Sequence, residues 1–258
     1  MNLLAPNAVI CCQPIGEGAF GLVRMCRVRT EEGAWVDGVI KTLKARDNPE
    51  QVDMFEREAS VLYRLQGIEG VPVFYGRYGV HPVKDIVMSY NGGRTYFDWI
   101  KDNLLVPKTP ELLCKTLYIL RRVGEILDQI HATGYGHNDL HMSNIVLDDN
   151  FNPTVIDFGF GLKFGSILFD HEMNLKRALG WHYDPLLSVY KERTCPENDV
   201  FSYALMVAYN IIQRFNHLIE PYDQLDYLVA RALRPDKSNR PTLTEFTECL
   251  KKLEEKYT

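Results

Sequence analysis

The sequence of 258 residues lacks several features that define large classes of proteins. Its six cysteines are too few and too irregularly spaced for a disulfide framework in a chain of this length. No apolar run reaches membrane-spanning length, and no Cys/His run has the spacing of a zinc site. The net charge of -5 is small, so electrostatics gives no reason to expect nucleic acid or a membrane surface as a partner. We therefore expect reduced thiols in a cytoplasmic or nuclear protein.

The termini and composition indicate one catalytic-size domain over residues 1–258. Hydrophobic residues make up 46% and charged residues 24%, which is typical of a globular protein and argues against disorder. The segment 1–12 has neither a basic start nor a long apolar core, so we do not expect secretion. The sequence shows no obvious repeat, low-complexity tract or linker.

The order of predicted elements indicates an α+β protein with a sheet-rich lobe followed by a helical lobe. Turn signals and β-prone runs predict strands at 9–15, 22–28, 36–43, 71–78 and 85–90. Asn48 and Pro49 predict a helix start, and apolar residues then recur at helical spacing up to Leu65. Beyond Asn91-Gly92-Gly93 the apolar spacing predicts helices at 110–131 and 198–215, and two more follow. We expect the joint between the lobes near 89–93, where a ligand cleft is favoured.

The first motif is a glycine-rich run, Gly16-Glu17-Gly18-Ala19-Phe20-Gly21-Leu22-Val23. Such a run can be an ordinary turn between strands, and taken alone it is weak evidence. A dinucleotide-binding interpretation requires a helix directly after the glycines, but here the following residues are β-prone. A glycine hairpin of this kind can bring its backbone close to phosphate groups, because no side chains prevent the approach.

A lysine and a glutamate form the second candidate group. Lys41 ends the third predicted strand, where a lysine is usually only solvated. Glu58 lies on the apolar face of the next helix, three residues after Phe55 and four before Leu62. A carboxylate there is costly unless it is paired, so Lys41 is its natural partner, and Glu56 is the fallback partner for the lysine. A lysine held in this way could contact the α- and β-phosphates of a nucleotide.

The third group is an ordered set of polar residues after the long predicted helix. His137-Asn138-Asp139-Leu140-His141-Met142-Ser143-Asn144 precedes Asp157-Phe158-Gly159, which follows an apolar run. Each aspartate alone is more often a turn residue than a catalyst. Together, Asn144 and Asp157 could hold Mg²⁺ through oxygen ligands, and Asp139 could accept the proton of an attacking hydroxyl.

With these motifs in order, the sequence resembles the eukaryotic protein kinases over nearly its whole length. Two further segments support the resemblance: Asp199-Val200-Phe201-Ser202-Tyr203 and the turn from Arg234 to Thr242. The resemblance implies a bilobal protein-kinase fold, with a small lobe at about 1–89, a hinge at 89–93 and a large lobe at 94–258. It also implies ATP and Mg²⁺ as cofactors and a protein as the acceptor.

The resemblance assigns nucleotide-binding roles to residues along the chain. Val39 occupies the usual alanine position above the adenine, and His137 and Phe158 belong to a stack that links the lobes. The residues implied to contact the nucleotide or its metal are Ile15, Gly16, Gly18, Gly21, Val23, Val39, Lys41, Met88 as gatekeeper, Ser89, Tyr90 and Asn91 in the hinge, Val146 and Asp157. The implied catalytic set is Asp139, Lys41, Glu58, His141 and Asn144.

Several positions depart from the family pattern. Asn138 replaces an arginine that usually grips a phosphorylated activation loop, so we expect activity without phosphorylation of that loop. His141 replaces a lysine, as in small-molecule kinases, and as an imidazolium it would make the rate sensitive to pH near neutrality. Leu186 stands where a glutamate usually pairs with the arginine represented by Arg240, so that arginine must find another acceptor or stay solvated.

Three functions remain open at this point. The leading hypothesis is an active protein kinase that phosphorylates serine or threonine. A pseudokinase scaffold is the second, and it would be favoured if the main catalytic residues had been lost. A small-molecule hydroxyl kinase is the third, suggested by His141 and by the short segment around 180–186.

Overall fold

The computed structural model describes residues 3–5, 8–18, 21–30, 32–168, 183–188, 192–219 and 223–257. The chain divides into two compact units. Unit 1 comprises Met1–Gly67, Val71–Asn91 and Asp157–Phe160, and unit 2 comprises Ile68–Gly70, Gly92–Ile156 and Gly161–Thr258. Within the described residues no helix is both long enough and apolar enough to cross a membrane.

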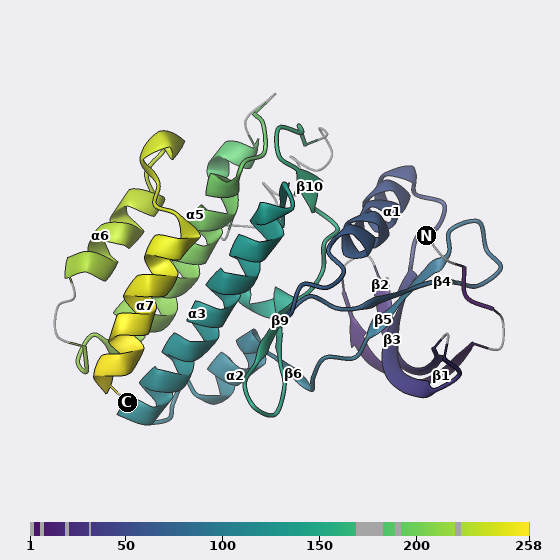
Figure 1. Ribbon diagram of the computed structural model, residues 1–258, viewed down its shortest axis with the longest axis horizontal. Coiled ribbons are helices and arrows are strands. Elements are labelled where there is room, and N and C mark those ends of the chain that lie inside the picture. Colours follow the sequence, from purple (N-terminus) through teal and green to yellow (C-terminus); the bar gives the residue numbers. More distant parts are fainter. Residues whose placement is uncertain are drawn as a thin grey trace. The chain divides into compact units, whose positions relative to one another are not determined.

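Unit 1 is a five-stranded antiparallel sheet with one helix (Figure 1). The strand order is β1-β2-β3-β5-β4. The strands are β1 (Val9–Glu17), β2 (Gly21–Arg29), β3 (Trp35–Leu43), β4 (Phe74–Tyr78) and β5 (Asp85–Ser89), and the helix α1 (Pro49–Arg64) lies between β3 and β4 in the chain. The predicted strand at 71–78 therefore begins three residues late.

The start of α1 is fixed by local chemistry. The side chain of Asn48 accepts hydrogen bonds from the backbone N–H groups of Glu50 and Gln51, and Pro49 occupies the first helical position. A proline is tolerated there because its missing N–H would have no partner inside the helix. The buried face of the helix includes Phe55 and Glu58. The prediction of this helix start is confirmed.

Unit 2 is mainly helical and holds two small sheets. Its helices are α2 (Tyr96–Asp102), α3 (Pro110–Ala132), α5 (Pro196–Val207), α6 (Asp223–Ala232) and α7 (Leu243–Tyr257). One sheet has the order β6-β8-β9, built from Arg94–Thr95, Ile145–Leu147 and Pro153–Val155, and the other pairs β7 (Tyr135–Gly136) with β10 (Leu162–Lys163). These short strands flank the segment that carries Asp139 and Asn144.

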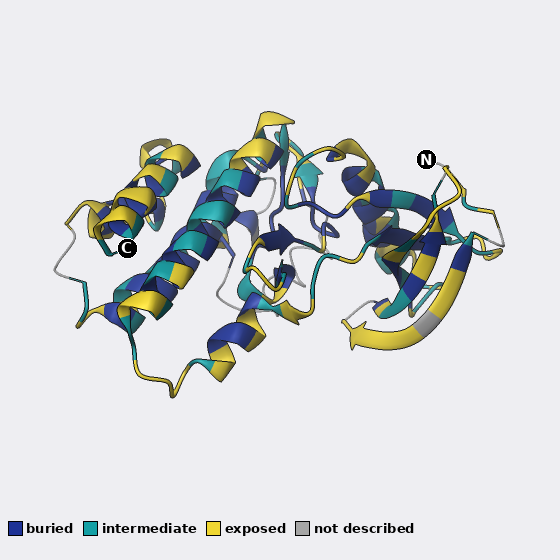
Figure 2. Ribbon diagram, turned by 60° about the horizontal axis from the view of Figure 1, so that its bottom comes forward, coloured by how far each residue is buried: buried dark blue, intermediate teal, exposed yellow. Residues whose placement is uncertain are grey.

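Helix α3 is the centre of unit 2, and ten of its residues are buried (Figure 2). Its mid-helix Gly124 permits close packing. A Cβ atom there would lie 2.6 Å from a side-chain carbon of Thr247 on α7 and 2.8 Å from the hydroxyl of Tyr203 on α5. A glycine at this position destabilises the helix by about 1 kcal/mol relative to alanine, but it permits this close packing. Helix α5 is thereby held against α3.

The predicted helix at 198–215 differs from the structure in its second half. Helix α5 ends at Val207 and continues as a π-helix over Ala208–Gln213. The side chain of Asn210 donates to the carbonyl of Met206 at 2.8 Å. That carbonyl, four residues back, is the usual acceptor of an α-helical amide, so the asparagine competes with the regular ladder.

Candidate active site

One group of predicted site residues meets in unit 1 at β3. The Nζ of Lys41 donates to both carboxylate oxygens of Glu58, at 2.8 and 2.7 Å, and lies 3.2 Å from Oδ1 of Asp157. Lys41 and Glu58 are nearly buried, whereas 46% of the Asp157 side chain is exposed. Asp157 also adopts a left-handed backbone with a φ of 65°, a conformation uncommon for a residue other than glycine. One ammonium is thus held between a buried and an accessible carboxylate.

Burial and charge act in opposite directions on this pair. Burial alone would lower the pKa of Lys41, but attraction to Asp157 and Glu58 raises it above its ordinary value. Burial raises the pKa of Glu58, and the ammonium of Lys41 opposes that shift. We infer that the lysine stays protonated at neutral pH, because both carboxylates favour its charged form.

The fallback partner proposed for Lys41 has a different contact. One carboxylate oxygen of Glu56 accepts from Arg77 of β4 at 2.5 Å, and the same guanidinium group donates to the carbonyl of Lys84. Arg77 is buried and lies over the ring of Phe55, 5.5 Å from its centroid. Two glutamates of helix α1 therefore form ion pairs with two different basic residues of the sheet: Glu56 with Arg77, and Glu58 with Lys41.

The glycine-rich run forms the turn of the β1–β2 hairpin. The N–H of Gly18 donates to the carbonyl of Gly21 at 2.9 Å, while Ala19 and Phe20 lie outside the described residues. A Cβ atom on Gly21 would lie 3.3 Å from two side-chain carbons of Lys41, which is tighter than most contacts. The absence of a side chain at this position lets the lysine run along β2.

The other predicted nucleotide-binding residues of unit 1 occupy adjoining strands. Val23 is paired with Lys41, and Val39 is paired with Met88 on β5. Val39 and Met88 are nearly buried. Further residues of this prediction are more accessible: Ile15 and Tyr90 are exposed, Gly16 lies in β1, and the Ser89 hydroxyl donates to the side-chain oxygen of Asn91.

Unit 2 holds the polar loop 137–144, and Asp199 at the start of α5 anchors its backbone. Oδ2 of Asp199 accepts from the N–H of His137 at 2.7 Å and from Nε2 of His131 at 2.9 Å. Oδ1 accepts from the N–H of Asn138 at 2.7 Å. Asn138 has a φ of 60°, a left-handed conformation that asparagine tolerates better than most residues. A single buried carboxylate thus fixes this turn.

The buried ring of His137 links the loop to the segment before Asp157. Its Nδ1 accepts from the N–H of Asp139 at 3.2 Å, so Nε2 carries the hydrogen donated to the carbonyl of Ile156 at 2.9 Å. The N–H of Ile156 in turn donates to the carbonyl of Asn144 at 2.9 Å. Ile156 directly precedes Asp157 in the chain.

Asp139 and Asn144 lie together in this loop. Nδ2 of Asn144 donates to the backbone carbonyl of Asp139 at 2.9 Å and lies 3.5 Å from its Oδ2. Because the amide nitrogen is used here, the side-chain oxygen is the atom of Asn144 suited to a cation. His141 lies nearby: its Nδ1 accepts from the N–H of Ser143, and its Nε2 lies 3.8 Å from Oδ2 of Asp139. Val146 follows in β8 and pairs with Thr154.

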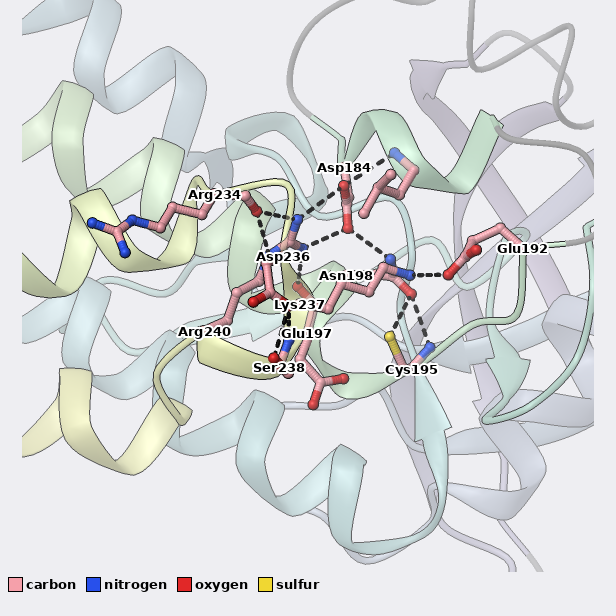
Figure 3. Close-up of polar contacts among 11 residues, drawn as sticks. Asp184, Glu192, Cys195, Glu197, Asn198, Arg234, Asp236, Lys237, Ser238 and Arg240 are labelled. Carbon is pink, nitrogen blue, oxygen red and sulfur yellow. Dashed lines mark hydrogen bonds and ion pairs between the residues drawn. The ribbon is translucent and has the colours of Figure 1, made fainter.

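The acceptor for Arg240 is Asp184, a residue that sequence analysis did not assign (Figure 3). Nη1 and Nη2 of Arg240 donate to the two carboxylate oxygens of Asp184 at 2.5 and 3.3 Å, and both residues are buried. The guanidinium group also donates to the carbonyls of Arg234 and Glu197. Asn198 gives Asp184 a further hydrogen bond at 2.8 Å.

This ion pair changes the interpretation of the segment around 180–186. Gly180, Trp181 and His182 lie outside the described residues, and Leu186 does not supply the missing acid. The carboxylate comes instead from Asp184, two residues earlier. The only sequence signal was an acidic residue beside Pro185 in a segment that needed one. Asp199 belongs to one of the sequence motifs, but the sequence does not predict the hydrogen bonds that it makes to the loop.

Comparison with known proteins identifies the family of the chain. A family model described as protein kinase domain matches residues 11–224, which is most of the chain. The chain therefore belongs to the protein kinase family, and the family resemblance and α+β fold class predicted from the motifs are confirmed.

Two plant proteins are similar to the chain. Calcium-dependent protein kinase 14 of Oryza sativa subsp. japonica is 27% identical over 198 residues, which cover 75% of this chain and 35% of that protein. Calcium-dependent protein kinase 27 of Arabidopsis thaliana is 25% identical over 232 residues, which cover 89% of this chain and 46% of that protein. The chain thus spans less than half the length of either relative.

Proposed function

We propose that this chain is an active protein kinase that transfers the γ-phosphate of ATP to a serine or threonine hydroxyl of a protein. The observation that carries the proposal is the ion-pair cluster in unit 1, in which Lys41 is held by Glu58 and Asp157. A buried ammonium oriented by two carboxylates is costly to build, and it suits a site that binds phosphate groups. A cytoplasmic or nuclear location is part of the proposal, supported by the few, irregularly spaced cysteines.

Each residue then has a defined chemical task. Lys41 contacts the α- and β-phosphate oxygens, and Glu58 fixes the position of the lysine. Asp139 orients the acceptor hydroxyl and takes its proton as the oxygen attacks the γ-phosphorus. Charged side chains held in position are sufficient to catalyse this reaction, because phosphoryl transfer needs little covalent chemistry from the protein.

The residues proposed for Mg²⁺ fit that ion chemically. Asp157 offers a half-exposed carboxylate, and Asn144 offers a side-chain oxygen because its nitrogen is bonded to Asp139. Hard oxygen ligands of this kind, few in number and completed by phosphate oxygens, are what Mg²⁺ prefers. When bound, the ion supplies charge neutralisation at the phosphates.

For the acceptor, the proposal rests on the family and on the site. Both similar proteins are named as protein kinases, and a protein hydroxyl is therefore the proposed acceptor. His141, in the place of the usual lysine, is proposed to contact the γ-phosphate from beside Asp139. We also propose that activity does not require phosphorylation of the activation segment, because Asn138 supplies no guanidinium group for a phosphate. Phosphatase treatment of the active enzyme should leave its rate unchanged.

The decisive experiment is a transfer assay with labelled ATP, Mg²⁺ and generic protein acceptors. Asp139→Asn and Asp157→Ala should each abolish transfer, whereas the matched control Asp149→Asn, at an exposed position, should retain it. Phosphoamino-acid analysis should show label on serine or threonine. Nucleotide binding without transfer by the unmodified protein would instead support a scaffold, and label on choline or an aminoglycoside would support a small-molecule kinase.

A further inference from the structure

The β1–β2 hairpin contains three cysteines, and phosphoryl transfer uses none of them. Cys11 on β1 and Cys26 on β2 are direct partners in the strand register. Cys11 is exposed, Cys26 is only 1% exposed, and neither forms a disulfide in the structure. Two thiols of contrasting accessibility therefore occupy opposite positions on neighbouring strands.

The hydrogen-bond pattern defines the kind of pair that these cysteines form. The N–H of Arg29 donates to the carbonyl of Ala8 at 2.8 Å, which places Ala8 and Arg29 at a hydrogen-bonding position of the ladder, although the N–H of Ala8 donates to Ala5 instead. The register continues without a shift to Cys11 and Cys26, three pairs further along. Because the two kinds of pair alternate in an antiparallel ladder, Cys11 and Cys26 form a non-hydrogen-bonded pair.

That geometry is compatible with a bond between the sulfur atoms. In a non-hydrogen-bonded pair the Cα atoms are about 4.5 Å apart and the two side chains lie closest together on one face of the sheet. Disulfides span Cα separations of about 4.4–6.8 Å. A pair with this typical spacing meets the distance requirement, near its lower limit.

The surroundings give the two thiols different chemical roles. Cys26 belongs to a buried apolar cluster with Val9, Val28 and Ile40. Strand β1, by contrast, is exposed along nearly all of its described length (Figure 2). A dissolved oxidant therefore reacts first with the thiol of Cys11. The buried thiol of Cys26 reacts in a second step.

We propose that Cys11 and Cys26 are a redox modification site, oxidised by hydroperoxides to a reversible cross-strand disulfide. The thiolate of Cys11 attacks hydrogen peroxide, forming a sulfenic acid and releasing hydroxide, which becomes water. The sulfur of Cys26 then attacks the sulfenic sulfur, and its proton leaves with the hydroxyl group as a second water. Two thiols are oxidised and one peroxide is reduced to two waters.

The position of the pair gives the link a structural effect. Cys11 lies five residues before Gly16, and Cys26 lies five residues after Gly21, so the bond closes a loop that contains the whole glycine-rich turn. A covalent closure removes conformational freedom from the segment that it encloses. The oxidised hairpin can no longer open by separation of its two strands at this point.

The test is peptide mapping of the full-length chain, reduced, exposed to hydrogen peroxide and alkylated without reductant. The expected product has lost two hydrogen atoms, contains one peptide linking Cys11 to Cys26, and returns to the starting mass with dithiothreitol. Cys11→Ser should abolish the link at an exposed position that tolerates the change. Cys114→Ser is the control that should retain it.

Three outcomes would overturn the proposal. These are a Cys11 sulfinic acid with no cross-link, a bond from Cys11 to the adjacent Cys12, and a disulfide of Cys26 that still forms in the Cys11→Ser variant. The readout is covalent and does not depend on nucleotide or on phosphotransfer. A protein that proved catalytically inactive would therefore still allow the site to be confirmed or rejected.

Discussion

Replacement of Asp199 should destabilise the protein more than replacement of any exposed acid. Its carboxylate satisfies the buried N–H groups of His137 and Asn138 as well as the ring of His131. In Asp199→Ala both backbone donors lose their acceptor, and each unsatisfied buried donor costs about 1–3 kcal/mol. The expected loss is therefore about 2–6 kcal/mol. Asp199→Asn keeps one oxygen and should lose roughly half as much.

Denaturant unfolding of both Asp199 variants beside the parent chain measures this loss. Burial alone would raise the pKa of Asp199, but the hydrogen bond and charge of His131, the charge of His137 and the backbone N–H of Asn138 lower it below its ordinary value. A lowered pKa gives stability that is complete above the unfolded value of about 3.9 and is lost as the pH falls towards the folded value. The gap between parent and Asp199→Asn should thus shrink below about pH 4. A loss under about 1 kcal/mol in Asp199→Ala would refute the reasoning.

Three further predictions concern the other contacts. Asp184→Ala removes the carboxylate partner of the buried Arg240 and should lower the free energy of unfolding by about 3–5 kcal/mol. A second change, Arg240→Met, should restore part of that loss. Equal stabilities of the single and double variants would contradict the ion-pair account. Gly21→Ala should press on Lys41 and raise the KM for ATP about tenfold, as overpacking of 1–3 kcal/mol implies, while an unchanged KM would argue against the close contact. Glu58→Gln should lower kcat/KM at least about tenfold at neutral pH, because Lys41 loses a charged partner. Burial raises the pKa of Glu58, so the rate of the parent should begin to fall on acidification at a higher pH than the pKa of an ordinary glutamate. An identical fall in rate at acidic pH in parent and Glu58→Gln would contradict this.

Local signals in the sequence were sufficient for much of unit 1. The start of α1 is written in two adjacent residues, Asn48 and Pro49, whose preferences act within one turn. The Lys41–Glu58 pair followed from one physical constraint, that a carboxylate on an apolar helix face needs a partner. The strand limits were less accurate, since β4 begins at Phe74 and not at residue 71.

The features that sequence analysis missed depend on contacts between distant segments. Asp184 and Arg240 are separated by 56 residues, and nothing local to either one distinguishes this pairing from others. The π-helix after Val207 carries the same apolar spacing as the α-helix before it, so periodicity could not separate them. The π-helical segment is distinguished by the hydrogen bond from the side chain of Asn210 to the carbonyl of Met206. That bond can be seen only in the three-dimensional structure.

The charges around Lys41 determine whether a triphosphate binds better with or without a divalent ion. One positive charge between two negative charges leaves the cluster with a surplus of one negative charge. A bare triphosphate would meet a lysine already neutralised, whereas a triphosphate that brings its own divalent ion would relieve the surplus on Asp157. Chelation of divalent ions should therefore weaken nucleotide affinity itself, and not only the rate of transfer.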